Sequence, residues 1–295
     1  MDGTGSAEFP ICFIGFGEAA GAFLGGWALP DPAAVSAFDI KSDDPATRPA
    51  MAERQAAAGI RGCDTAAAAL AGARAVFSLV TADRALEAAV AAAPHLEPGA
   101  LWLDGNSCAP GTKRRAAETV ETAGGRYVDL AVMAPVHPLR HLVPLLLSGP
   151  HAAAAAALLR TLGMRPAIAG DEIGQASAIK MIRSVMIKGM EALTAECLLS
   201  ARRAGVEEAV LGSLEASDPD RDWRGRSAYN LERMMVHGAR RAAEMREAAA
   251  TVAELGLGGG MAAATAEWQD RIAATGAPAG GDDLIARADA ILARL

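Results

Sequence analysis

Aromatic and basic residues are scarce in this 295-residue chain. Phe, Trp and Tyr together make up only 4% of it, whereas hydrophobic residues of all kinds make up 52%. Much of the hydrophobic content is alanine, which predicts closely packed helices and excludes a disordered chain. No charge-free apolar run reaches about 18 residues, the length that a membrane-spanning helix needs. We therefore expect a globular protein that does not insert into a membrane.

Positive charge is outweighed by negative charge. The 28 Lys and Arg residues stand against 35 Asp and Glu residues, which gives a net charge of −7. Nucleic-acid binding needs clustered basic residues, so this balance argues against a nucleic-acid partner. Two local clusters, Lys113-Arg114-Arg115 and Arg240-Arg241, are expected to lie on solvent-exposed helix faces.

Cysteine is scarce too. The four cysteines are far apart in the sequence, with no C-x-x-C pair and no His at zinc spacing. This pattern argues against a disulfide scaffold, predicts no metal site and fits a reducing cytoplasm. No Lys or Arg precedes Lys41, so we expect no secretory signal, which needs a positively charged leading segment.

Short apolar segments alternate with alanine-rich segments of helical length as far as residue 170. This alternation is typical of a parallel sheet with helices on both faces, as in a Rossmann-type α/β domain. The predicted strands are residues 10–14, 35–39, 75–80, 100–104, 127–132 and 145–148.

Beyond residue 170 the β-branched runs disappear. The pattern predicts one long helix over residues 175–203 and four further helices over 206–217, 227–255, 258–275 and 281–294. We therefore expect an NAD(P)-binding Rossmann domain at 1–170 and an all-helical substrate and dimerisation domain at 171–295, joined by the long helix.

A glycine-rich turn follows the first predicted strand and opens a small-residue helix. It matches the pattern G-x-G-x-x-A with Gly15, Phe16, Gly17, Glu18, Ala19 and Ala20. The first glycine allows the tight turn, the second lets the backbone approach a pyrophosphate, and the alanine lets helix pack on strand. The pyrophosphate would then lie at the helix N-terminus, where free N–H groups favour anions. The alternative is that these small residues serve tight packing alone.

Asp39 ends the next predicted strand, at the usual distance from such a turn. A carboxylate there accepts the ribose hydroxyls of NAD and repels the 2′-phosphate of NADP. Lys41 lies two residues further and could partly offset that repulsion. The sequence therefore predicts NAD as cofactor, with NADP as the alternative.

Four stretches in this order resemble the β-hydroxyacid dehydrogenases, which include 3-hydroxyisobutyrate and 6-phosphogluconate dehydrogenases. The glycine turn is the first. The others are similar to the family patterns D-x-S-T-x-x-P, G-x-x-F-x-D-A-P-V-S-G-G and G-x-x-x-x-x-K, and they lie at residues 104–110, 125–132 and 174–180. Residues 237–245 resemble a branch of the family with a phosphogluconate-dehydrogenase-like C-terminal domain.

The resemblance implies that Lys180 exchanges a proton with the substrate oxygen. It also places Ser107 at the family's threonine near nicotinamide, with Asn106 beside it. Val80 and Thr81 match the loop beneath the adenosine and the nicotinamide ribose. The alternative interpretations are an ordinary solvated lysine at Lys180 and a helix cap at Ser107.

Two positions depart from the family. The family's lysine is commonly followed four residues later by a substrate-contacting Asn, which is Ser184 here. The family's Ser-Gly-Gly turn, which binds a substrate carboxylate, is Met133-Ala134-Pro135 here. Methionine offers no side-chain donor and proline has no N–H, so part of the anion cradle is lost. The substrate is expected to be bulkier or less acidic than a simple 3-hydroxyacid.

A later helix supplies further candidates. His237, Arg240 and Glu244 fall on one face of it, and the resemblance implies that the corresponding family helix reaches the active site. Arg240 could replace the lost carboxylate donors, or it could simply pair with Glu244 at the surface. We keep both interpretations.

These features favour an NAD(P)-dependent oxidoreductase acting on a CH–OH or C=O group of a small hydroxyacid-like substrate. The alternatives are oxidative decarboxylation of a β-hydroxyacid, imine reduction, and a non-catalytic NAD-binding protein. The alanine- and methionine-rich helical domain suggests a homodimer.

Overall fold

A computed structural model describes residues 10–29 and 31–295 of the chain. The expectation that no secretory signal is present concerns in part residues 1–9, which lie outside the described residues. The chain forms two compact units, the first extending to Lys180 and the second spanning Met181–Leu295. The predicted domain boundary between residues 170 and 171 stays a prediction. In the described part of the chain, no helix is both long and apolar enough to cross a membrane.

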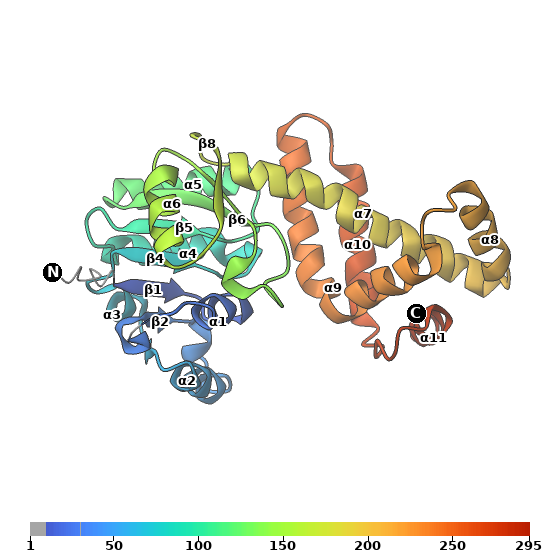
Figure 1. The fold of residues 1–295 in the computed structure, drawn as a ribbon, viewed down its shortest axis with the longest axis horizontal. Coiled ribbons are helices and arrows are strands. Elements are labelled where there is room, and N and C mark those ends of the chain that lie inside the picture. Colours follow the sequence, from blue (N-terminus) through green and yellow to red (C-terminus); the bar gives the residue numbers. More distant parts are fainter. Residues whose placement is uncertain (1–9, 30) are drawn as a thin grey trace, which may run out of the picture. The chain divides into compact units, whose positions relative to one another are not determined.

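The first unit is built on one eight-stranded sheet with the strand order β3-β2-β1-β4-β5-β6-β7-β8 (Figure 1). The strands are β1 Ile11–Ile14, β2 Ser36–Phe38, β3 Arg61–Gly62, β4 Ala75–Ser78, β5 Leu101–Asp104, β6 Arg126–Val132, β7 Leu145–Ser148 and β8 Pro166–Gly170. The neighbouring strands from β3 to β6 run parallel. The predicted α/β fold class is confirmed.

Three details of the sheet differ from the prediction. Strand β7 runs antiparallel to β6, so the sheet is not wholly parallel. Strands β3 and β8 were not predicted. Both lie at an edge of the sheet. Strand β3 has only two residues, both exposed, and β8 begins with a proline, which lacks the N–H that a central strand needs. A two-residue strand is too short to give a sequence signal, and a proline at the start of β8 argues against a strand.

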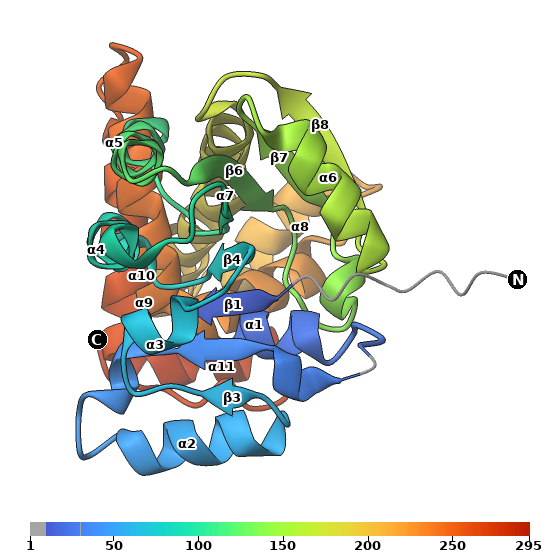
Figure 2. The same ribbon diagram turned by 90° about the vertical axis from the view of Figure 1, so that its left-hand side faces the viewer.

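Helices cover both faces of this sheet (Figure 2). One face is packed by α1 Glu18–Leu24, α2 Arg48–Ala57 and α6 Ala152–Thr161, and the other by α3 Ala66–Leu70, α4 Ala85–Ala92 and α5 Pro110–Thr122. Several of the few aromatic residues gather in one core, where the rings of Phe13 and Trp27 stack with centroids 5.5 Å apart. The ring centroid of Phe77 lies 5.4 Å from that of Phe13 in the same cluster.

The strand order reverses between β1 and β4, because β1 leads outward to β2 while β4 lies on its other side. At such a switch point the loops after the two strands separate and leave room for a ligand at the carboxyl edge of the sheet. The loops that follow β1, β2, β4 and β5 all leave from this edge. They contain the cofactor residues that the sequence predicts, except Glu18, Ala19 and Ala20, which form the first turn of α1.

The second unit is helical. Its elements are α8 Glu207–Ser217, α9 Trp223–Glu254, α10 Gly260–Ala274 and α11 Leu284–Leu292, together with most of α7 Gln175–Ala204. All five predicted helices are present. Helix α9 begins at Trp223 rather than at residue 227, because the Asp222 carboxylate caps it by accepting the Gly225 N–H at 2.8 Å. A Cβ at Gly238 would lie 2.6 Å from the Gln269 carbonyl oxygen, so the close packing of α9 on α10 requires glycine there.

Candidate active site

The two glycines of the turn after β1 have different roles. Gly15 has a φ of +88°, and a Cβ there would lie 2.5 Å from the Leu79 carbonyl oxygen, so the fold itself requires this glycine. A Cβ at Gly17 would meet nothing within 4 Å. Gly17 is also the N-cap of α1, and no side chain caps this helix start. Open space next to uncapped N–H groups fits the pyrophosphate of a dinucleotide. Packing alone therefore explains Gly15 but not Gly17.

The other residues of the turn shape it from inside or lie at its rim. The Phe16 side chain is fully buried and packs edge-on against Phe13, with ring centroids 5.8 Å apart. Only the Phe16 backbone faces the loop. Ala20 is buried against the sheet, as its predicted packing role requires, whereas Ala19 is half-buried and Glu18 is exposed.

Asp39 joins the turn to the end of β2. Its Oδ2 accepts the Phe16 N–H at 2.8 Å and its Oδ1 accepts the Lys41 N–H at 3.0 Å. These bonds hold the carboxylate in place at the carboxyl edge of the sheet. Because a carboxylate has about four acceptor sites, it can still accept ribose hydroxyls. The position of Asp39 therefore fits the predicted dinucleotide.

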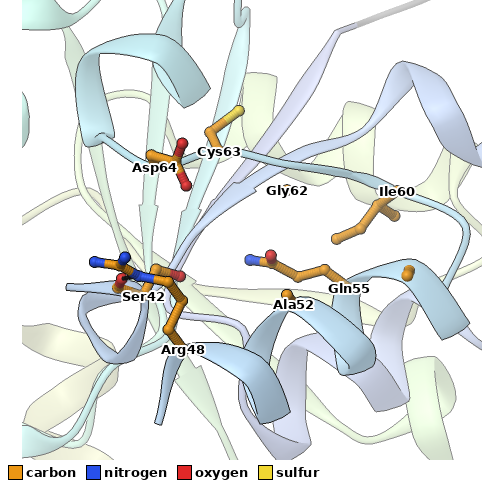
Figure 3. A pocket seen from close by; sticks show the side chains of 9 residues that line it. Ser42, Arg48, Ala52, Gln55, Ile60, Gly62, Cys63 and Asp64 are labelled. Carbon is orange, nitrogen blue, oxygen red and sulfur yellow. Dashed lines mark hydrogen bonds between the residues drawn. The ribbon is translucent and has the colours of Figure 1, made fainter. Parts of the chain in front are cut away.

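A pocket of about 240 Å³ lies between α2 and β3 (Figure 3). Ser42, one of its lining residues, donates its N–H to the Asp39 carbonyl oxygen at 2.8 Å. Arg48 and Gln55 of α2 line it, and the Gln55 side chain points into it (Figure 3). The Arg48 Nε donates to the Ser42 carbonyl oxygen at 2.6 Å. A second cation besides Lys41 therefore lies near the end of β2, which bears on the NADP alternative.

The Asn106 side chain ties the loops after β4 and β5 together. Its Oδ1 accepts the Val80 N–H at 2.7 Å, and its Nδ2 donates to Ser78 Oγ at 3.0 Å and to Asp104 Oδ1 at 2.7 Å. Asn106 is 3% exposed. Its amide is thus engaged within the protein, where it fixes Val80. The neighbouring Thr81 is exposed at the start of a 3-10 helix.

Lys180 and Ser107 meet at the edge of the first unit. The Lys180 Nζ donates to Ser107 Oγ at 2.6 Å, with Lys180 half-buried on the first turns of α7. The N-cap position of α5 is held by Ala109, two residues after Ser107, so Ser107 does not occupy the cap position of the alternative interpretation. The Lys180 side chain is partly buried and bonded to a specific hydroxyl, which favours the predicted role over that of an ordinary solvated lysine.

The remaining candidates belong to the second unit. Ser184 Oγ accepts a hydrogen bond from Lys188 Nζ at 3.1 Å, and Lys188 also pairs with Glu244 at 3.0 Å. Arg240 pairs with the same Glu244 carboxylate. The ion pair that one interpretation expected is therefore present, although Glu244 is buried rather than at the surface. The pKa of His237 is lowered mainly by burial and further by the positive charges of Arg233 and Arg240.

Sequence reasoning missed two buried charge clusters, one in each unit, because it assigned Lys113 and Arg241 to solvated helix faces. That assignment is wrong for both residues. Lys113 has 0% of its surface exposed and Arg241 has 8%. Lys113 binds Asp104, and Arg241 binds Glu191 through two nitrogens. A signal was present for Lys113, since it is spaced to share one face of α5 with apolar residues, namely Ala116, Ala117 and Val120.

The turn after β6 supports the predicted loss of an anion cradle. The Met133 N–H donates to the Pro144 carbonyl oxygen at 2.9 Å, and Pro135 has no N–H. Of the three residues that replace Ser-Gly-Gly, Met133 has its N–H in this backbone bond and Pro135 has none, which leaves the N–H of Ala134 as a possible donor to a substrate. Within residues 10–29 and 31–295, no group of three His, Cys, Asp or Glu side chains could hold a metal ion.

Comparison with known families matches both parts of the chain. Residues 10–158, about half of the chain, match the family described as the NAD binding domain of 6-phosphogluconate dehydrogenase. Residues 201–272 match a domain of unknown function, DUF1932. An uncharacterized 28.5 kDa protein of Methanothermus fervidus is 25% identical over 143 residues, which make up 48% of this chain and 54% of that protein. The match thus spans about half the length of that curated relative.

Solved structures match the whole chain. A conserved hypothetical protein from Sinorhizobium meliloti 1021 is 41% identical with a TM-score of 0.76, over 98% of both chains. The conserved protein MTH1747, of unknown function and structurally similar to 3-hydroxyacid dehydrogenases, is 30% identical with a TM-score of 0.65, over 89% of this chain and 96% of that chain. Mycobacterium tuberculosis 3-hydroxyisobutyrate dehydrogenase, solved with L-serine, shares the fold at a TM-score of 0.71 and 18% identity, over 95% and 97%. The chain belongs to the β-hydroxyacid dehydrogenase superfamily and carries an NAD-binding domain of the 6-phosphogluconate dehydrogenase type.

Proposed function

We propose that this protein is an NAD(P)-dependent dehydrogenase or reductase that acts on the CH–OH or C=O group of a small hydroxyacid-like compound. The observation that carries the proposal is the 2.6 Å contact between Lys180 Nζ and Ser107 Oγ. Ser107 lies on the loop after β5, at the same carboxyl edge of the sheet as the Gly17 turn and Asp39. A proton-transfer group and a dinucleotide cradle on one edge suit hydride-transfer chemistry.

The cofactor would be held by the residues that follow β1, β2 and β4. The open backbone at Gly17 and the start of α1 would take the pyrophosphate, Asp39 would accept ribose hydroxyls, and Val80 and Thr81 would contribute mainly backbone groups. When bound, nicotinamide supplies or accepts a hydride. Asp39 favours NAD, whereas Lys41 and Arg48 are the cations that could accommodate a 2′-phosphate.

Lys180 would move the proton. Its Nζ would deliver a proton to the substrate oxygen during reduction and accept one during oxidation. Ser107 Oγ orients the ammonium before the substrate arrives. Asn106 would act indirectly, by fixing Val80 and the loop that carries Ser107. The family resemblance also predicts substrate contacts for Ser184, His237 and Arg240, with Ser184 in the place of the family's Asn, and these roles stay predictions.

The altered turn at residues 133–135 narrows the substrate class. With few backbone donors left there, binding of a small carboxylate would depend on other groups. We therefore favour a substrate that is bulkier or less acidic than a simple 3-hydroxyacid.

We also propose that the chain works as a homodimer in a reducing cytoplasm. Large apolar side chains are exposed along α7, with Ile182 48%, Met186 66% and Leu193 56% exposed. Such a stripe suits a partner helix. None of the four cysteines forms a disulfide bond.

The test is a turnover screen with NAD(H) and NADP(H) against small hydroxyacids, semialdehydes and L-serine. Lys180→Ala should lower kcat by about 10²–10⁴-fold, the usual contribution of a general acid–base group. Added alkylamines should restore part of the lost rate, because they supply the missing base. If Lys180→Ala turned over at the wild-type rate, the proton transfer would have to be assigned to another group. If the wild-type protein bound cofactor but turned over no substrate, a non-catalytic NAD-binding protein would be favoured.

A further inference from the structure

An ammonium and two carboxylates are completely buried in the first unit. Asp104, Lys113 and Asp129 each have at most 1% of their surface exposed. The Lys113 Nζ donates to Asp104 Oδ1 at 2.8 Å and lies 3.5 Å from Asp129 Oδ1. Burial alone would lower the pKa of Lys113, but the two carboxylates outweigh it and raise that pKa. A charged ammonium thus bridges two buried carboxylates that would otherwise repel each other.

The Asp104 end of this network holds the loop that carries Ser107. Asp104 Oδ1 accepts the Asn106 N–H at 3.0 Å as well as the Asn106 side-chain amide. Asp104 Oδ2 accepts the Tyr127 hydroxyl at 2.7 Å. Asn106 directly precedes Ser107, so the backbone position of Ser107 depends on the Asp104 carboxylate.

The Asp129 end holds the start of α7. Asp129 Oδ2 accepts the Ser177 N–H at 2.9 Å, and Asp129 Oδ1 accepts the Ser177 hydroxyl. The Ser148 hydroxyl donates to Asp129 at 3.1 Å and accepts the Ala176 N–H at 3.0 Å. These bonds satisfy N–H groups that a helix start leaves unpaired, and they place negative charge at its positive end. Lys180 follows Ser177 by three residues, less than one helical turn.

We propose that Lys113, with Asp104 and Asp129, positions Lys180 against Ser107. This inference rests on the proposed function, which assigns proton transfer to that pair. Lys180 and Ser107 are 73 residues apart and come from different elements. Their separation therefore depends on how the loop after β5 is held relative to the start of α7. The ammonium of Lys113 links the carboxylates that hold these two segments, so it sets that separation.

The test uses mild variants at both ends of the network. Ser177→Ala removes the hydroxyl bond to Asp129 and keeps the backbone N–H bond, whereas Tyr127→Phe removes one bond to Asp104. Ser36→Ala is the matched control: Ser36 is also buried, and its hydroxyl donates to the Ala69 carbonyl oxygen at 2.6 Å, but it lies on β2 outside the network. Lys113→Met removes the bridge itself.

Two readouts are compared, namely the Lys180 Nζ–Ser107 Oγ distance in crystal structures of the variants and steady-state kinetics. In Ser177→Ala combined with Tyr127→Phe, and in Lys113→Met, we expect the distance to exceed about 3.5 Å, beyond hydrogen-bond range. We expect kcat to fall by about tenfold or more, because ångström-scale misplacement is costly, while the Kd for NADH changes much less than kcat. Ser36→Ala should keep the wild-type distance and kcat.

An unchanged distance in the double variant would overturn the positioning role, whether or not Lys113→Met folds. A parallel loss of NADH affinity and kcat, matched by Ser36→Ala, would also overturn it, because that result indicates general destabilisation. Absence of turnover in the wild-type protein would contradict the proposed function instead, and the distance would still decide the positioning role.

Discussion

The Lys180 ammonium donates a hydrogen bond to Ser107 Oγ at 2.6 Å, although the two residues are 73 positions apart. An ammonium held by a hydroxyl is oriented before any substrate binds, which reduces the reorganisation needed for proton transfer. The contact lies wholly within the first unit, where Lys180 is the last residue. It provides the structural basis for assigning the proton transfer to Lys180.

Removal of the hydroxyl should weaken catalysis less than removal of the amine. Ser107→Ala leaves Lys180 in place but removes the hydroxyl to which Lys180 donates, so we expect kcat to fall by about tenfold, against the larger loss expected in Lys180→Ala. Ser107→Thr keeps the hydroxyl and should retain most of the activity. Steady-state kinetics of the three variants check this order. A Ser107→Ala enzyme as impaired as Lys180→Ala would show that Ser107 itself is indispensable.

The two glycines of the turn should respond differently to alanine. Gly17→Ala has room for its Cβ and an ordinary φ of −90°, so the thermal stability should stay close to wild type. Its methyl group would nevertheless enter the space assigned to the pyrophosphate, and NADH binding should weaken by tenfold or more. Gly15→Ala, in contrast, should lower the thermal stability, because the left-handed conformation of this residue alone costs about 1–2 kcal/mol when a side chain is present.

Thermal unfolding and NADH titration of both glycine variants separate the two effects. If Gly17→Ala bound NADH as tightly as wild type, the pyrophosphate would not lie over Gly17. That outcome would remove the main observation that distinguishes a cofactor cradle from tight packing.

Asp39 should control the choice between NAD and NADP. Asp39→Asn keeps the shape of the side chain but removes its charge, and charge-assisted hydrogen bonds are worth about 1.5–3 kcal/mol. We therefore expect NADH affinity to fall by at least tenfold and the discrimination against NADPH to relax. Asp31→Asn is the matched control, because Asp31 also caps a 3-10 helix through its carboxylate. An unchanged preference in Asp39→Asn would show that Asp39 does not touch the ribose.

Because of Lys188, the free energy of unfolding should rise with pH in the alkaline range. Burial lowers the pKa of Lys188 from its ordinary 10.5, and Glu244 only partly offsets this effect. Between the lowered folded pKa and 10.5 the unfolded chain binds more protons than the folded one, so the free energy of unfolding rises with pH in that window. The cost of burying the ammonium is fully present below the folded pKa.

Denaturant unfolding from pH 7 to 10 checks this dependence. Lys188→Met should show a smaller rise in the free energy of unfolding with pH than wild type, and Arg240 remains as the partner of Glu244. Lys41→Met, which alters an exposed lysine, should keep the wild-type slope. Identical slopes for Lys188→Met and wild type would mean that Lys188 keeps its ordinary pKa when folded.

Local patterns account for what could be predicted from the sequence. A central strand, a glycine turn and a helix start lie within ten residues of one another, so the turn at Gly15 and the carboxylate at Asp39 could be found from spacing alone. The long helix and its Lys180 follow from the helical period and the family pattern. The contact between Lys180 and Ser107 could not be predicted, because it depends on how distant segments pack.

Long-range packing accounts for what was missed. In sequence, Lys113 stands in a Lys-Arg-Arg run with the composition of a solvated face, and only Asp104 and Asp129, on two different strands, make its burial possible. Similarly, Arg241 can be buried because it donates a hydrogen bond to the Glu191 carboxylate of another helix. A buried ion pair has no local signature, because each partner alone looks like a surface residue.

The most direct test of the account is a calorimetric titration of the purified protein with NADH and, separately, with NADPH. We predict saturable binding of both, with a lower Kd for NADH because of Asp39, and NADH binding weakened by tenfold or more in Gly17→Ala. A lower Kd for NADPH would contradict the role given to Asp39 and point to Lys41 and Arg48. Binding of neither cofactor would contradict the central claim that the edge of the sheet from Gly15 to Asp39 holds a dinucleotide.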